Sequence, residues 1–248
     1  MKAKEGEMQV VILAGGKGTR LKPFTTILPK PLIPVGERPI LEIVLLQLKA
    51  AGFKEYIFSV GYLAALIEAY FGDGGKWGIK IRYSREAAPL GTAGPLAIIK
   101  GLAPEFLVMN GDILCNMDYR KFFKYHLKAK NDITICSFAK KVKIDLGVLK
   151  IRDNILQDYI EKPEYQYDVS MGVYGIRRKL ISTIPKRKHY DLPDLIMDQK
   201  KKGANIGIYQ FKGEWLDIGR IEDHQIAQNI MAEKEDSYLG KKARRGNR

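Results

Sequence analysis

The feature that most constrains the fold is an apolar run that ends in glycines. Met8–Ala14 (MQVVILA) is apolar at every position except Gln9, and Gly15, Gly16 and Gly18 follow within four residues. A short run of this kind is typical of a strand buried on both faces of a parallel sheet. Glycines directly after such a strand allow a sharp turn and leave backbone N–H groups free to bind an anion. We therefore expect a parallel α/β sheet with a ligand site at the end of its first strand.

Strand-like and helix-like segments alternate through the first half of the chain. We predict helices over Pro39–Ala51, Leu63–Phe71 and Ala93–Lys100. Between them lie the runs predicted as strands, Tyr56–Val60, Ile79–Tyr83 and Phe106–Met109. This alternation indicates βαβ units with right-handed crossovers.

The second half has a different rhythm. A helix predicted over Tyr119–Ala129 precedes four predicted strands, Ile133–Ala139, Gly147–Ile151, Ile155–Ile160 and Val169–Ile176. Helices over Lys179–Ile184 and Leu192–Lys202, a strand over Ile206–Phe211 and a helix over Ile221–Lys234 complete the pattern. Because no low-complexity linker separates the halves, we predict one α/β domain whose second half is a mixed sheet sharing the same core.

Composition and charge exclude several classes of protein. The 248 residues are 46% hydrophobic and include only two cysteines, Cys115 and Cys136, which excludes a disordered chain and a disulfide scaffold. No apolar run approaches the ~20 residues of a membrane span and no signal peptide is evident, so we expect a cytoplasmic protein. The formal net charge of +14 favours anionic partners. The lysines of 121–130 are spaced like the wet face of a helix, and residues 236–248 are expected to form a mobile basic tail, so nucleic-acid binding is disfavoured.

Leu13–Leu21 (LAGGKGTRL) is the strongest candidate for a phosphate site. A dinucleotide fingerprint would require glycine where Leu21 stands, and no Walker loop is present. Arg20 can hold two phosphate oxygens at once. Lys30, between two prolines in LPKP, is a compact charge that can follow a transferring phosphoryl group. We predict phosphate binding here; a plain turn and a surface lysine are the alternatives.

Two aspartates are candidates for a metal site. Asp112 follows the apolar run Phe106–Met109, and ligands in α/β sheets gather beyond the carboxyl ends of strands. Asp217 lies among apolar neighbours, where a carboxylate requires a partner or a metal. Each could instead cap the helix that follows it.

Two further segments are candidates for substrate contacts. Glu161 and Lys162 precede Pro163, and they can bind hydroxyl groups and a phosphate only if the strand bends there; a surface ion pair is the alternative. Gly91 would allow a flat base to lie on the backbone, whereas Thr92 is also a credible N-cap of the helix predicted after it.

The remaining polar residues contain no machinery for covalent catalysis. The three histidines, His126, His189 and His224, lack metal-ligand spacing and are expected to face solvent, and no Ser-His-Asp arrangement is present. Cations, glycine-rich loops and carboxylates together indicate phosphoryl or nucleotidyl transfer by direct displacement.

Taken together, these strings resemble the sugar-1-phosphate nucleotidyltransferase family, also called nucleoside-diphosphate-sugar pyrophosphorylases. The resemblance spans about Val10 to Ala232. Its parts occur in family order: LAGGKGTRL (13–21), LPKPLIPV (28–35), PLGTAGPL (89–96), NGD (110–112), EKP (161–163) and WLDIG (215–219).

The resemblance implies a single catalytic domain over residues 8–235, in a three-layer, Rossmann-like α/β fold with a mixed, mostly parallel sheet. It also implies that a sugar 1-phosphate attacks the α-phosphorus of a nucleoside triphosphate, with Mg²⁺ as cofactor and pyrophosphate as the leaving group. The implied residues are Arg20, Lys30 and Asp112 for catalysis; Leu13, Ala14, Gly15, Gly16, Gly18, Thr19, Gly91 and Thr92 for the nucleotide; Gly147, Glu161, Lys162 and Gly172 for the sugar phosphate; and Asp112 and Asp217 for the metal.

The finer substrate reading rests on PLGTAGPL and NGDILC, which are most similar to mannose- and heptose-1-phosphate guanylyltransferases. GTP with a mannose- or heptose-type sugar is therefore the expected pair. Thymidylyl-, cytidylyl- and uridylyltransferases acting on glucose 1-phosphate or a related phosphate remain alternatives, as does a non-catalytic nucleotide-binding regulatory subunit. Ser170 stands where many members carry an asparagine that contacts the sugar. We expect neither the C-terminal β-helix of several relatives nor its acyltransferase activity, and a homo-oligomer is compatible with the family.

Overall fold

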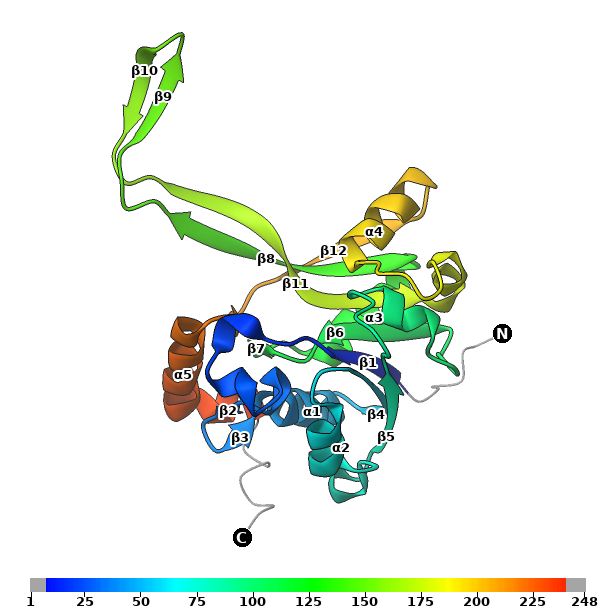
Figure 1. Cartoon of the computed structure of the whole chain (residues 1–248). Coiled ribbons are helices and arrows are strands. Elements are labelled where there is room, and N and C mark those ends of the chain that lie inside the picture. Colours follow the sequence, from blue (N-terminus) through cyan, green and yellow to red (C-terminus); the bar gives the residue numbers. More distant parts are fainter. Residues whose placement is uncertain (1–7, 240–248) are drawn as a thin grey trace.

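The computed structural model describes residues 8–239, which form a central seven-stranded sheet with the strand order β12-β8-β11-β6-β1-β4-β5. The strands are β1 (Met8–Ala14), β4 (Phe53–Val60), β5 (Lys80–Arg85), β6 (Glu105–Asn110), β8 (Ile133–Lys143), β11 (Glu164–Arg177) and β12 (Ile206–Phe211). Neighbouring strands are parallel, except that β11 runs antiparallel to both β6 and β8. The predicted mixed, mostly parallel sheet is therefore confirmed (Figure 1).

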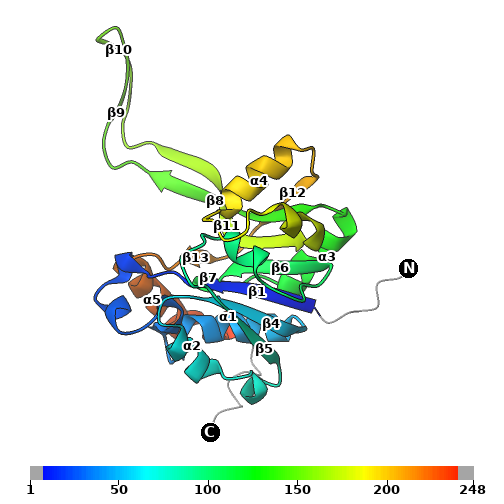
Figure 2. The same ribbon diagram turned by 45° about the vertical axis from the view of Figure 1, so that its right-hand side comes forward.

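Helices cover both faces of the sheet and give the three expected layers. On one face pack α1 (Ile40–Ala50), α2 (Ala64–Phe71) and α3 (Tyr119–Ala129), and on the other packs α4 (Leu192–Lys201). The last helix, α5 (Ile221–Leu239), contacts α1 and contributes to a third apolar cluster. Figure 2 shows α4 and α1 on opposite sides of the sheet.

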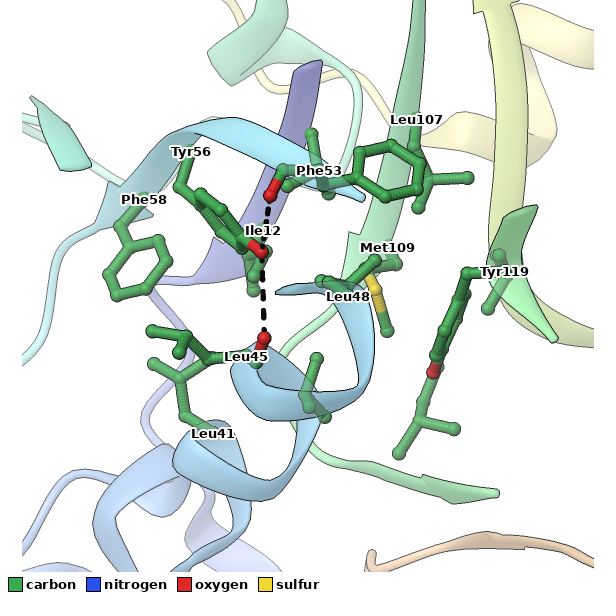
Figure 3. Close-up of a cluster of buried hydrophobic side chains, with 14 of the residues drawn as sticks. Ile12, Leu41, Leu45, Leu48, Phe53, Tyr56, Phe58, Leu107, Met109 and Tyr119 are labelled. Carbon is green, nitrogen blue, oxygen red and sulfur yellow. Dashed lines mark hydrogen bonds between the residues drawn. The ribbon is translucent and has the colours of Figure 1, made fainter. Parts of the chain in front are cut away.

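The first strand is buried on both faces, as its continuous apolar run predicts. Ile12 belongs to the cluster on the α1 side and Val11 to the cluster on the α4 side, because successive side chains of a strand point to opposite faces. Figure 3 shows the first of these clusters, in which Leu45 of α1 packs among sheet residues that include Ile12 and Met109. Burial on both faces fixes the direction in which the chain enters the glycine loop.

One predicted helix, Ala93–Lys100, is instead a single 3-10 turn, η5 (Gly94–Ala97). Glycine and proline open this segment, and two β-branched residues, Ile98 and Ile99, follow it. These residue types are among the weaker helix formers, and so short a segment cannot offset the cost of helix nucleation.

The predicted helix over Lys179–Ile184 is likewise a 3-10 helix, η6 (Arg178–Thr183). The Ser182 hydroxyl donates to the carbonyl of Lys179, and the Thr183 hydroxyl donates to that of Leu180. Such local bonds compete with the α-helical ladder, and a proline two residues after Thr183 prevents the helix from continuing.

The elements that were not predicted are short. They are the strands β2 (Pro34–Val35), β3 (Arg38–Pro39), β7 (Ile113–Cys115) and β13 (Trp215–Asp217), and the 3-10 helices η1 (Thr19–Leu21), η2 (Phe24–Thr26), η3 (Lys30–Leu32) and η4 (Gly75–Trp77). Two or three residues are too few to show a periodic pattern.

An antiparallel ribbon extends from the sheet. β8 and β11 are both longer than predicted, and they lead into a hairpin formed by β9 (Val148–Arg152) and β10 (Ile155–Ile160). We call residues 140–168 the arm. Figures 1 and 2 show from two directions that the arm projects beyond the body of the molecule.

The C-terminal helix α5 continues to Leu239, past the predicted end at Lys234, where the backbone leaves helical geometry with φ −131°. The basic residues of the predicted tail, in 240–248, lie outside the described residues. Within residues 8–239, no helix is long and apolar enough to cross a membrane.

Candidate functional site

The site begins where the neighbouring strands β1 and β6 end. Leu13 of β1 is in register with Asn110 of β6, and the Gly111 amide donates to the Leu13 carbonyl at 3.0 Å. Leu13 and Ala14 thus close β1 directly beside the turn that carries Asp112. The structure brings the glycine loop and the Asn110–Asp112 turn together at the carboxyl edge of the sheet, as predicted.

Gly18 is the glycine of this loop that the geometry requires. Its φ is +60°, and a Cβ atom there would lie 2.9 Å from the Thr25 side chain and 3.0 Å from Cβ of Lys30. The Thr25 hydroxyl donates to the Gly18 carbonyl at 2.9 Å, which holds the loop against η2. Gly16 and Thr19 are exposed, with open space around the Cα of Gly16. The loop is thus closely packed at Gly18 and accessible at Gly16.

Lys30 lies between two prolines at the start of η3, and its ammonium group forms an ion pair with Asp112. Only 12% of the Lys30 side chain and 20% of the Asp112 side chain are exposed. Asp112 Oδ1 is buried and, within residues 8–239, has no hydrogen-bond partner. An unpartnered buried carboxylate oxygen is costly unless a ligand completes its coordination.

Asp217 and Arg20 complete a group of four charged side chains with Lys30 and Asp112. β13 pairs with β7 so that Asp217 is opposite Ile113, one residue after Asp112. The pKa of the Asp217 carboxyl is raised, first by desolvation and then by the charge of Asp112, while Lys30 and Arg20 act in the opposite direction. Asp217 does not cap α5, because Asp223 accepts the hydrogen bond from the Arg220 amide.

The two aspartates fit a hard divalent cation. Among the described residues, no group of three or more His, Cys, Asp or Glu side chains could hold a metal ion unaided. Mg²⁺ usually takes one or two protein carboxylates and completes its shell with phosphate oxygens and water. Asp112 and Asp217 supply two carboxylates, and the free Oδ1 of Asp112 is the donor that such an ion requires.

The second glycine segment packs against the start of α4. Gly91 has φ +78°, and a Cβ there would lie 2.7 Å from both the Asp191 carboxylate and the Tyr190 carbonyl. The Thr92 hydroxyl donates to Asp191 and accepts from the Leu192 amide at 2.7 Å. Thr92 therefore caps α4, not the helix expected after it.

Glu86 is a residue that sequence reasoning missed. A Cβ atom on Gly15 would lie 2.8 Å from the Glu86 carboxylate, so the two residues are in direct contact. Glu86 accepts hydrogen bonds from the Ser59 hydroxyl at 3.2 Å and the Leu90 amide at 3.0 Å. It thus lies between the two glycine-rich segments. The sequence signal that could have identified Glu86 is its position. It follows β5 directly and stands three residues before Pro89, where the motif PLGTAGPL begins.

Three of the four residues expected to bind the sugar phosphate lie on the arm. Gly147 packs against the Tyr159 ring, and the Tyr159 hydroxyl donates to Glu161 at 3.0 Å. Lys162 is exposed, with φ +44° at the bend before Pro163. Within the described part of the chain, no hydrogen bond or ion pair joins these residues to Lys30 or Asp112.

Gly172 is the exception, because it lies beside the four-residue group. The pairing of β11 with β8 is interrupted between Ser170 and Tyr174, and Gly172 in this bulge has φ +72°. A Cβ atom there would lie 2.6 Å from the Asn110 amide group. The Ser170 hydroxyl is hydrogen bonded to the Tyr174 hydroxyl at 2.8 Å.

The expectation that all three histidines face solvent is wrong for His126. This side chain of α3 is 1% exposed, and its ring nitrogens lie 2.7 Å from the Thr134 hydroxyl and 3.0 Å from the Glu105 carboxylate. The α3 pattern places position 126 on the buried face, where these partners satisfy the ring. His189 is exposed, and His224 is half-buried and bonded to the Pro34 carbonyl.

Comparison with known proteins finds relatives over most of the chain. The family model described as "Nucleotidyl transferase" matches residues 9–234. UTP–glucose-1-phosphate uridylyltransferase of Synechocystis sp. is 32% identical over 238 residues, covering 88% of this chain and 61% of that protein. Mannose-1-phosphate guanylyltransferase of Mycobacterium tuberculosis is 30% identical, covering 88% of this chain and 62% of that protein. The chain thus spans about six tenths of the length of these curated relatives.

Solved structures share the fold over most of the chain. HddC from Yersinia pseudotuberculosis superposes with a TM-score of 0.69 at 29% identity, covering 90% of this chain and 98% of that one. HddC has also been solved in complex with GMP-PN, which superposes with a TM-score of 0.68 at 28% identity over the same shares. A putative glucose-1-phosphate thymidylyltransferase from Bacillus anthracis has a TM-score of 0.73 at 23% identity, covering 90% and 94% of the two chains, and shows the fold alone.

Proposed function

This chain belongs to the nucleotidyl transferase family, and on that premise we propose that it joins a nucleoside triphosphate to a sugar 1-phosphate. An oxygen of the sugar phosphate attacks the α-phosphorus, the bond between the α-phosphorus and its bridging oxygen breaks, and pyrophosphate leaves. The observation that carries the proposal is the half-buried Lys30–Asp112 pair beside Asp217 and Arg20, in which the second carboxylate oxygen of Asp112 has no hydrogen-bond partner within residues 8–239.

The two cations have different tasks in this reaction. The exposed guanidinium of Arg20 can hold two oxygens of the triphosphate. Lys30 is half-buried and held by its flanking prolines, so its ammonium group stays close to the reacting phosphorus and stabilises the charge that develops there. Gly16, Gly18 and Thr19 place backbone N–H groups beside the same phosphates.

Asp112 and Asp217 would hold Mg²⁺ together with phosphate oxygens. The bound ion would supply charge neutralisation, so that two polyanions can approach each other. In the free protein, Lys30 balances Asp112, whereas burial raises the pKa of the Asp217 carboxyl and repulsion by the charge of Asp112 raises it further. A bound divalent cation would offset that repulsion and would give Asp112 Oδ1, which has no hydrogen-bond partner within residues 8–239, a partner.

We assign the sugar phosphate to Lys162 and the sugar hydroxyl groups to Glu161, with Gly147 and Gly172 providing close backbone approach. Gly172 already lies against Asn110, beside Asp112. The Tyr159–Glu161 hydrogen bond orients the Glu161 carboxylate at the root of the hairpin. This division predicts that changes at Lys162 raise the KM for the sugar phosphate more than the KM for the nucleotide.

We propose GTP as the nucleotide because of Glu86. A carboxylate beside Gly15 can accept two N–H groups from the edge of guanine, whereas uracil and thymine offer one donor between two acceptors. The HddC complex with GMP-PN supports the same choice. Leu13, Ala14 and Gly91 would form the walls of this base site. A mannose- or heptose-type phosphate is the expected acceptor.

The test is pyrophosphate release with each common nucleoside triphosphate and several sugar 1-phosphates in the presence of Mg²⁺. We expect turnover with GTP and a mannose- or heptose-type phosphate, and its loss in Asp112→Asn but not in the matched exposed variant Asp153→Asn. Glu86→Gln should lower the preference for GTP over UTP on the order of tenfold, since one charge-assisted acceptor is lost. Turnover with UTP or dTTP alone would overturn the base assignment, and tight nucleotide binding without turnover would favour a regulatory subunit.

A further inference from the structure

The arm hairpin has one face made of exposed apolar side chains. β9 and β10 are antiparallel with Leu149 opposite Tyr159 and Ile151 opposite Leu156. Residues directly opposite each other share a face, as do Leu149 and Ile151, which are two apart in one strand. These four side chains are exposed by 49% (Leu149), 63% (Ile151), 56% (Leu156) and 56% (Tyr159).

A bulge in β10 maintains this face. Leu156 and Tyr159 are three residues apart, so in a regular strand they would point to opposite sides. The register shifts between Leu156 and Asp158, and the extra residue, Gln157, returns Tyr159 to the side of Leu156. The opposite face is mixed: Lys150 pairs with Asp158 across the strands, Arg152 is opposite Ile155, and Val148 is opposite Ile160. The hairpin therefore has one wholly apolar face and one face, called the wet face below, that also carries its charged side chains, and the apolar face is the one suited to packing against another surface.

The arm carries none of the chain's excess charge. Residues 140–168 contain six Lys and Arg and six Asp and Glu, whereas the whole chain has a net charge of +14. Several of these charges are paired within the arm, as in Lys141–Glu164 and Lys143–Asp145. An acidic partner or membrane would be attracted to other parts of the molecule. Two copies of this chain repel each other least where each is neutral.

From these observations we infer that the arm is a self-association surface: two copies of the chain stack the Leu149–Ile151–Leu156–Tyr159 faces of their arms about a twofold axis. A two-stranded ribbon is only marginally stable alone in water, and a second ribbon laid on its apolar face makes the two-layered sheet that covers both. Because the same surface serves on both copies, the contact closes as a dimer. The wet faces, with Lys150 and Asp158, remain in solvent.

The test uses two isoleucines of the hairpin that are equally exposed but lie on opposite faces. Ile151 is 63% exposed on the apolar face, and Ile155 is 64% exposed on the other. The full chain and the variants Ile151→Glu and Ile155→Glu are examined by sedimentation velocity between about 1 and 100 µM. We expect a dimer for the parent and for Ile155→Glu, and a dimer constant weakened about tenfold or more for Ile151→Glu.

A cysteine-labelling measurement covers the case in which Ile151→Glu affects folding. The thiol of Leu156→Cys should react with an alkylating reagent more slowly at about 100 µM than at about 1 µM protein, and that of Ile155→Cys at the same rate at both, because only position 156 is covered by the partner copy; the two native cysteines are buried. A parent chain that stays monomeric throughout would overturn the inference. So would a dimer that both glutamate variants leave intact, which would place the contact on another surface. Pyrophosphate release by the parent is recorded separately, so failure of this inference is distinct from failure of the proposed activity.

Discussion

The two ends of β6 hold charged side chains in opposite ways. At the amino end, Glu105 accepts a hydrogen bond from Arg177 at 2.8 Å and lies 3.0 Å from His126, and Arg177 also bonds Asp132 at 3.2 Å. At the carboxyl end, Asp112 is paired with Lys30 through one oxygen, and its other oxygen is buried without a partner within residues 8–239. One strand of six residues thus connects a network of charged groups that have hydrogen-bond partners to a group of charges in which one buried oxygen has no partner within residues 8–239.

This difference separates stability from function. A satisfied network of buried polar groups holds the elements that it joins, here α3, β6, β8 and β11, in one arrangement. An incompletely satisfied group of charges destabilises the free protein and gains most when a ligand supplies the missing partner. Substitutions at the amino end should therefore change the free energy of unfolding, and those at the carboxyl end should change turnover.

The largest effect is expected for Asp112→Asn. An amide keeps the size of the side chain but loses the charge that balances Lys30 and binds a metal, so kcat should fall about 1,000-fold, or about 4 kcal/mol. Urea denaturation should show a much smaller change in the free energy of unfolding, because Asp217 remains near Lys30 to balance its charge. If Asp112→Asn instead unfolded readily and retained its kcat, the carboxyl end of β6 would contribute to stability and not to turnover.

Arg20→Ala and Lys30→Ala should each cost between about 2 and 4 kcal/mol in kcat/KM for nucleotidyl transfer, since each removes one preorganised cation. Lys17→Ala, in the same loop, is the matched control, because Lys17 is exposed. Steady-state kinetics on all three variants makes the test. If Lys17→Ala lowers kcat/KM as much as Lys30→Ala does, the assignment of Lys30 as the cation beside the reacting phosphorus is wrong.

His126→Ala tests the amino end. The substitution removes a buried ring and its contacts with Thr134 and Glu105, which keep only their second partners, Asn131 and Arg177, so the protein should lose about 2–3 kcal/mol of unfolding free energy. Below the unfolding transition its kcat should match the parent. His189→Ala, at an exposed position, should stay within about 0.5 kcal/mol of the parent in the same urea titration.

The smallest effect is expected for Asp217→Asn, for which thermal stability should rise while turnover falls. The folded-state pKa of Asp217 is raised, so the folded protein binds its proton more tightly than the unfolded chain, and stability falls as pH rises through this range. The asparagine variant should therefore melt at a slightly higher temperature than the parent near pH 7. The gain should disappear as pH falls to where Asp217 is protonated in both states, while turnover at pH 7 decreases. A lower melting temperature at pH 7 would contradict the pKa direction.

The order of strands and helices could be predicted from the sequence because buried positions are occupied by apolar residues at regular spacing. β1, α3, β10 and β12 have the predicted bounds, and each is marked by an apolar run or a helical spacing. The common edge of the glycine loop and Asp112 could be predicted as well, since parallel strands place their carboxyl ends together. Asp217 lies on β13, outside the central sheet, and was expected at this edge only from the family resemblance.

The rest depends on contacts between residues that are distant in sequence. Gly91 is required by Asp191, about one hundred residues away, and Thr92 caps a helix of that same segment. The helical spacing of α3 places His126 on the buried face, but the partners that satisfy its ring, Thr134 and Glu105, come from other elements and cannot be identified from that spacing. Likewise, the lengths of β8 and β11 in the arm follow from their pairing with each other and not from burial, so apolar patterning predicted only their inner halves.

The course of β11 has a mechanical consequence. This single strand starts in the arm at Glu164 and, eight residues later, passes Asn110 at Gly172, in the stretch where its pairing with β8 is interrupted. A break in pairing is the place where a strand bends most easily. A tilt of the arm would therefore be taken up where β11 packs against Asn110, so that a force applied at the far end of the ribbon reaches the NGD turn along one strand and through one packing contact.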